Sequence, residues 1–181
     1  FSFLLINNND SENKKTVTIT AFPDANNDQL TLNTIISEEM SEKAWCSKNH
    51  PNAHILFDFQ NRSVCLNAFH LWTGEDPENG RHMKSIQFSG SNDGEEWTTP
   101  IKFECHCNRS NESSYGNTFE HFWGAAFYRY IKLESPEPNW KGTNEIYLKR
   151  IEFFGQLQLN TNTNPKSAHD IGKTFSNPES H

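Results

Sequence analysis

The stretch that decides the fold class of this chain is Ser89-Gly90-Ser91-Asn92-Asp93-Gly94-Glu95-Glu96-Trp97. Before it, Ile86 and Phe88 alternate with polar residues, which predicts a β-strand with one buried face. Asp93-Gly94 supplies the positive φ of a tight hairpin turn at little steric cost. We therefore expect a strand, a turn and a returning strand, with Trp97 packed under the turn.

The same alternation of apolar and polar residues recurs along most of the chain. It is found in Val17–Ile19, Ile55–Phe59, Val64–Trp72, Ser85–Ser89, Tyr128–Leu133 and Ile146–Phe153. Short strands at this spacing, separated by Gly, Pro, Asn and Asp, predict an all-β sandwich or barrel. One stretch departs from the pattern: Ser37 to Ala44 predicts a short helix, with Ser37 as its N-cap. The apolar start, Phe1 to Ile6, predicts a buried strand.

Length and composition indicate one domain with short additional segments. The chain has 181 residues, and its 14 Phe, 5 Trp and 4 Tyr suit half-buried sheet faces. Its net charge of −7 argues against nucleic acid or an anionic membrane as the partner. No apolar run is long enough to span a bilayer. We assign residues 1–156 to the domain and 157–181, rich in Asn, Thr, Ser and Pro, to a disordered tail or linker.

The four cysteines carry no clear metal signature. Cys65 lies in a strand-like run and is expected in the core. Cys105-His106-Cys107 has one intervening residue, whereas a structural zinc pair usually has two to four. No second pair follows at a suitable distance, so no metal site is predicted. Whether Cys105 and Cys107, or Cys46 and Cys65, have a redox role stays open.

Six motifs in order resemble one known family. They are Trp45-Cys46-Ser47-Lys48-Asn49, Phe57-Asp58-Phe59, Gly90 to Trp97, Tyr128-Arg129-Tyr130-Ile131, Pro138 to Gly142, and Glu152-Phe153-Phe154-Gly155. This order is similar to the discoidin domain, or coagulation factor 5/8 type C domain, of the galactose-binding-like superfamily. The likeness covers about Leu30 to Gly155 and is strongest to a branch in intracellular multi-domain proteins, including protist proteins with a BTB domain.

The resemblance implies a jelly-roll β-sandwich of about eight antiparallel strands with one short helix. It also implies a ligand site on loops at one end and no catalysis. Many secreted members close the domain with a disulfide between its two ends, but here no Cys lies near Phe1 or Gly155. That departure favours an intracellular segment of a longer multi-domain protein. Four Asn-x-Ser sequons, at Asn9, Asn61, Asn108 and Asn111, point the other way.

Loops at one end of the sandwich supply the candidate ligand residues. The corresponding stretches are Trp45 to Pro51, Thr73 to His82, and Pro138 to Gly142, and the candidates are Trp45, Lys48, Asn49, His50, Arg81, His82, Asn139, Trp140 and Lys141. Trp140, in a polar loop, either stacks on a sugar or anchors a peptide, or instead caps the sandwich. Arg81 and His82 either donate hydrogen bonds to a ligand or belong to a solvated loop. Trp123-Gly124 is a further candidate.

The sequence also bears on one ion pair and on calcium binding. Arg129 is expected to pair with Glu152 or Asp58. Sugar-binding relatives often hold a structural calcium near the first long loop, and Glu38, Glu39 and Glu42 offer oxygen ligands. Their spacing enforces no cage, so no cofactor is predicted.

Function is expected to be binding rather than catalysis. The chain has no nucleophile elbow, zinc-protease motif or phosphate loop, and a dyad of His70 with Asp58 would lack a nucleophile. The first hypothesis is a module that binds a protein partner. The alternative is a carbohydrate-binding module, and an anionic-lipid binder is disfavoured by the acidic charge.

Overall fold

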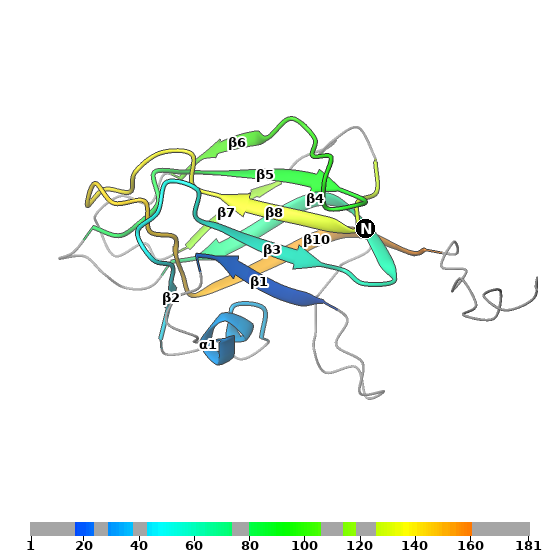
Figure 1. Ribbon diagram of the computed structural model, residues 1–181, viewed down its shortest axis with the longest axis horizontal. Coiled ribbons are helices and arrows are strands. Elements are labelled where there is room, and N and C mark those ends of the chain that lie inside the picture. The colour runs from blue at the N-terminus through cyan, green and yellow to red at the C-terminus, as the bar shows by residue number, and fades with distance from the viewer. Residues whose placement is uncertain are drawn as a thin grey trace, which may run out of the picture.

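The structure, a computed structural model, is a β-sandwich (Figure 1). It describes residues 17–23, 29–37, 43–73, 80–105, 114–118 and 126–160, with the backbone alone for 29–31 and 114–118. Several sequence predictions fall outside these residues: the strand over Phe1–Ile6, the ligands Glu38, Glu39 and Glu42, Trp123-Gly124, Cys107, the sequons at Asn9, Asn108 and Asn111, and the segment 161–181.

One layer is a five-stranded antiparallel sheet. Its spatial order is β1 (Thr18–Phe22), β3 (His54–Asp58), β8 (Tyr130–Glu134), β5 (Ser85–Ser91) and β6 (Ile101–Glu104). The alternating sequence explains the burial: in β3 and β8 every second residue is buried. One face of this sheet is therefore apolar and lies against the second layer.

The second layer is a three-stranded antiparallel sheet. It is formed by β10 (Arg150–Leu159), β4 (Arg62–Trp72) and β7 (Ser114–Thr118), and a separate pair joins β2 (Trp45–Cys46) to β9 (Tyr147–Leu148). The register of β10 against β4 shifts between Phe154 and Gly155. A Cβ at Gly155 would lie 2.0 Å from the Cys65 carbonyl oxygen, so only glycine fits at this bulge.

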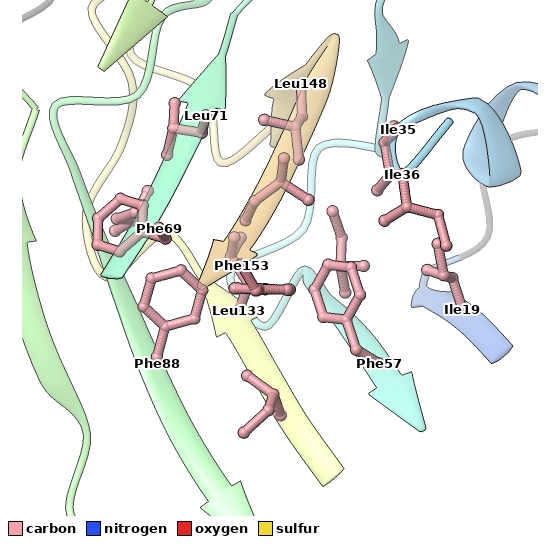
Figure 2. Packing of buried hydrophobic residues seen from close by; sticks show 14 of the residues in the cluster. Ile19, Ile35, Ile36, Phe57, Phe69, Leu71, Phe88, Leu133, Leu148 and Phe153 are labelled. Carbon is pink, nitrogen blue, oxygen red and sulfur yellow. The ribbon is translucent and has the colours of Figure 1, made fainter. Parts of the chain in front are cut away.

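Aromatic side chains from both layers meet in the core (Figure 2). The rings of Phe57 and Phe153 meet edge to face with centroids 5.0 Å apart, and Phe69 lies 5.0 Å from Phe88. Burial of each such ring stabilises the fold by about 1.5–3 kcal/mol. Ile35 and Ile36, which follow the short helix α1 (Gln29–Thr34), cover one side of this core (Figure 2).

The all-β prediction is confirmed, with three corrections of detail. The described residues contain a helix that was not predicted, α1. Of the predicted helix Ser37 to Ala44, residues 38–42 lie outside the described residues, and Ser37, Lys43 and Ala44 are not helical. Gly94 has the predicted positive φ of 82°, but the β5–β6 connection runs over residues 92–100 and is not a tight turn. β10 continues to Leu159, past the domain boundary placed at residue 156.

The expected arginine pair forms with one of its two candidate partners. Arg129 Nε and Nη2 donate to the two carboxylate oxygens of Asp58 at 2.8 and 3.0 Å. Asp58 raises the pKa of Arg129 through these hydrogen bonds. Glu152 instead accepts from Arg150. Arg129 therefore ties the segment before β8 to the end of β3.

Candidate functional site

Three loops gather at one end of the sandwich because of the strand register. His54 of β3 and Gln87 of β5 both oppose Glu134 of β8, so the start of β3, the start of β5 and the end of β8 share this end. The adjoining segments, residues 47–53, 80–84 and 135–146, are called here the loop cluster. It lies at the left of Figure 1.

Hydrogen bonds fasten the three segments to one another. Between the first and third segments, the Ser47 amide donates to the Ile146 carbonyl at 3.0 Å, and the Asn144 amide donates to Asn49 Oδ1 at 2.8 Å. Between the second and third, the Trp140 amide donates to the His82 carbonyl at 3.2 Å. The loop cluster is therefore one connected surface, held by backbone groups at both junctions.

Trp140 is the exposed aromatic residue of the loop cluster, with 44% of its surface accessible. It stands on a closed turn in which the Asn139 amide donates to the Thr143 carbonyl at 2.8 Å and Gly142 takes a φ of 84°. The Trp140 indole N–H makes no hydrogen bond to any residue that the structure describes. A flat apolar ring with an available donor is suited to a ligand that is both apolar and hydroxylated.

One lysine lies over the Trp140 ring, and another follows Trp140 in the chain. The Lys84 ammonium lies 5.0 Å from the ring centroid, in a cation–π contact that occupies one face of the indole. Lys141 follows Trp140 on the turn and is exposed. The exposed part of Trp140 is the surface on which a ligand can stack.

Arg81 and His82 were predicted together but are placed differently. The Arg81 guanidinium lies 5.8 Å from the ring centroid of Tyr147, and the side chain is half-buried. His82 is 7% exposed, with Nδ1 3.2 Å from the Thr73 hydroxyl. Arg81 thus keeps some exposed surface at the loop cluster, whereas His82 mainly supports the fold.

Trp45 and Asn139 are buried, so neither presents a surface to a ligand. Trp45 is 2% exposed and belongs to the core through the β2–β9 pair. Asn139 is 0% exposed, and its amide closes the turn beneath Trp140. Lys48 and Asn49 are exposed on the neighbouring segment.

A second aromatic group lies near the first segment of the loop cluster. His50 meets Phe22 edge to face at 5.2 Å, and His54 stacks on Phe22 at 5.6 Å. Phe22 is 47% exposed, although it lies in none of the stretches predicted to bind a ligand. The alternation of the sequence does predict this exposure. Ile19 and Ala21 face inward on β1, so Phe22, the next residue, faces the opposite side of the strand.

The predicted His70–Asp58 dyad does not form. His70 lies on β4 with its ring 3.9 Å from that of Trp72, while Asp58 on the other sheet accepts from Arg129. Burial lowers the pKa of His70, opposed by the charge of Glu152. His70 is therefore packed against an aromatic ring, away from Asp58.

The described residues contain no cluster of His, Cys, Asp and Glu that could hold a metal ion. Within the same residues, no helix has the length and apolar character needed to cross a membrane.

Comparison with known proteins identifies solved structures that share this fold. No family model matches the sequence, and no curated protein matches it. Solved structures do match: a family 32 carbohydrate-binding module from a family 31 glycoside hydrolase of Clostridium perfringens has a TM-score of 0.60 at 14% identity, over 78% of this chain and 92% of the other. A fucose-binding module of Streptococcus pneumoniae gives 0.56 at 12% identity, over 77% and 91%.

A third match is the family 32 module of NanJ from C. perfringens, solved with galactose, with a TM-score of 0.55 at 10% identity over 77% of this chain and 93% of the other. These modules have the galactose-binding-like, discoidin-type sandwich, so the predicted fold is confirmed. The finer likeness to the intracellular BTB branch stays a prediction.

Proposed function

We propose that this domain is a non-catalytic carbohydrate-binding module whose ligand stacks on Trp140. The observation that carries the proposal is an indole with 44% of its surface exposed, on a turn closed by a buried asparagine. An exposed tryptophan loses contact with water when a ligand covers it, and a rigid ring has little side-chain freedom to lose. The loop cluster presents this ring in a fixed position.

Polar groups beside the ring supply orientation. The candidate donors are the Trp140 indole N–H and the side chains of two residues of the loop cluster: Lys141, which follows Trp140, and the half-buried Arg81. A sugar presents an apolar face of C–H groups and an edge of hydroxyls. Stacking on the indole would cover the first, and these donors would bind the second.

The solved neighbours favour a carbohydrate over the protein partner that the sequence motifs alone favour. The neighbours include a fucose-binding module and a module solved in complex with galactose. Since a shared fold does not fix a ligand, this support is secondary to the exposed ring. A non-catalytic role agrees with the placement of His70 and Asp58 on separate sheets, which removes the one dyad that the sequence suggested.

A glycan array tests the proposal, run on the full chain in calcium and in chelator. Wild-type protein is expected to bind a set of glycans, and Trp140→Ala is expected to abolish that signal. Trp97→Ala is the matched control, because Trp97 also carries a lysine over its ring, with Lys132 Nζ at 4.8 Å, but lies on the β5–β6 connection at the other end. No signal from folded wild-type protein, or equal loss in both variants, would contradict the proposal.

A further inference from the structure

A second exposed aromatic side chain lies at the end of the sandwich that carries the loop cluster. Among the residues that the structure describes, the exposed large hydrophobic side chains are Phe22, Trp140 and Leu159. Phe22 is the last residue of β1 and opposes His54, the first residue of β3, so it lies at the same end as Trp140. Leu159 opposes Arg62 at the start of β4, at the other end. Exposed apolar surface is therefore found twice beside the loop cluster.

Two imidazole rings contact the Phe22 ring. The His50 ring meets it edge to face with centroids 5.2 Å apart, and the His54 ring stacks on it at 5.6 Å. Both histidines are half-buried, so each keeps accessible surface. The three residues are called here the Phe22 patch. A hydrogen bond from the Asn144 amide to Asn49 Oδ1, at 2.8 Å, fastens the segment of His50 to the third segment of the loop cluster.

One residue fixes the tautomers of both imidazoles. The Asn52 amide donates to His50 Nδ1 at 3.1 Å, so neutral His50 carries its proton on Nε2. His54 Nδ1 lies 3.0 Å from the Asn52 carbonyl oxygen, which can only accept, so neutral His54 is protonated on Nδ1 and its Nε2 is an acceptor. Neither Nε2 atom makes a hydrogen bond to any residue that the structure describes. The patch thus offers one donor and one acceptor beside an exposed apolar ring.

This combination fits one sugar unit. A sugar hydroxyl both donates and accepts, so two hydroxyls can bind His50 Nε2–H and His54 Nε2 while C–H groups cover the exposed part of Phe22. Building on the proposed function, we infer that the Phe22 patch is a second sugar-binding subsite and that the preferred ligand is an oligosaccharide rather than a single sugar. One unit of the ligand binds at Trp140, and another binds at the Phe22 patch.

The test compares the best oligosaccharide of the glycan array with the monosaccharides that compose it, by NMR titration of the full ¹⁵N-labelled chain. One hydrogen bond or one apolar contact of this kind changes affinity by about fivefold to tenfold. We expect Phe22→Ala and His50→Ala each to weaken oligosaccharide binding by such a factor. Both variants should bind the monosaccharide that shifts the Trp140 indole signal as tightly as wild-type protein does. Leu159→Ala is the matched control, because it removes an exposed apolar side chain at the other end and should change neither affinity.

A second measurement examines the two imidazoles directly. Long-range ¹H–¹⁵N spectra of the free protein, recorded at mildly alkaline pH where imidazoles are neutral, distinguish the two tautomers. We expect His50 to be protonated on Nε2 and His54 on Nδ1. The same tautomer in both residues would remove the donor–acceptor pair and overturn the inference.

The outcomes separate this inference from the function on which it rests. If Phe22→Ala and His50→Ala bind the oligosaccharide as wild-type protein does, the inference fails and a module with one subsite, at Trp140, remains. If both variants lose oligosaccharide and monosaccharide binding equally, the patch is not a separate subsite and the inference fails as well. An array without signal from folded protein would instead remove the proposed function, and the inference with it.

Discussion

Replacing Asn139 by alanine tests whether one buried amide holds the turn that presents Trp140. Asn139 Nδ2 donates to the Thr143 hydroxyl at 2.8 Å and to the Glu145 carbonyl at 3.3 Å. Its Oδ1 accepts from the Thr143 amide at 3.0 Å and lies 3.2 Å from the Thr143 hydroxyl. With 0% of the residue exposed, water cannot replace these bonds unless the turn opens.

The magnitude follows from counting these bonds. A net hydrogen bond contributes about 1 kcal/mol, and an unsatisfied buried partner costs about 1–3 kcal/mol. The two short bonds, to the hydroxyl and from the backbone amide of Thr143, should dominate. We expect Asn139→Ala to lower the free energy of unfolding by about 2–3 kcal/mol, which corresponds to a fall of roughly 4–12 °C in Tm for a domain of this size. Glycan binding should fall too, because the turn carries the ring.

Urea unfolding followed by tryptophan fluorescence measures this change, and Asn92→Ala is the matched control. Asn92 also bridges backbone groups, with Oδ1 accepting from the Arg129 amide at 3.0 Å, but it is exposed and lies at the other end. Its loss should cost about 1 kcal/mol or less and leave glycan binding unchanged. A loss below about 1 kcal/mol in Asn139→Ala, with binding intact, would refute the reasoning.

Three further predictions concern other parts of the structure. Hydrogen bonds from the Ser85 hydroxyl and then from Lys102 hold the pKa of Glu137 below its ordinary value, so the stability that Glu137 contributes is present at neutral pH and lost as pH falls through the lowered pKa. Ser85→Ala should raise the pKa of Glu137 in an NMR titration, and an unchanged pKa would exclude this cause. Gly90→Ala should destabilise the fold by about 1–3 kcal/mol in urea, because its Cβ would lie 2.6 Å from the Tyr128 ring; an unchanged midpoint would contradict that packing. Burial raises the pKa of the Cys65 thiol, so this thiol should react with Ellman's reagent only on unfolding, and rapid labelling of folded protein would show that it is accessible.

Much of the sandwich could be predicted because its strands alternate. Ile55, Phe57 and Phe59 occupy every second position, and all three are fully buried. The helix α1 could not be found in this way, since its sequence has no acidic first turn and no basic last turn. The β5–β6 connection is longer than the tight turn that was predicted. Asp93-Gly94 indicates a residue with positive φ, but it does not indicate that the next strand, β6, begins only at Ile101.

The candidate site was predictable as a set of loops but not residue by residue. A tryptophan in a polar segment is compatible with either burial or exposure. Of the two tryptophans among the candidate residues, Trp45 is buried and Trp140 is exposed. Trp45 is buried because β2 pairs with β9, about a hundred residues away in the chain, and such a pairing leaves no local signal. Trp140 is exposed because the side chain of its neighbour, Asn139, turns inward and closes the loop.

Chemical-shift mapping with the best array ligand tests the central claim most directly. Titration of the ¹⁵N-labelled domain should shift the Trp140 indole N–H and the backbone amides of the non-proline residues in 47–53, 80–84 and 139–144. It should leave Trp97 and the other amides of residues 92–99 unchanged. Shifts that cluster on the β5–β6 connection or on an outer sheet face, with the Trp140 indole signal fixed, would contradict a ligand site at the loop cluster.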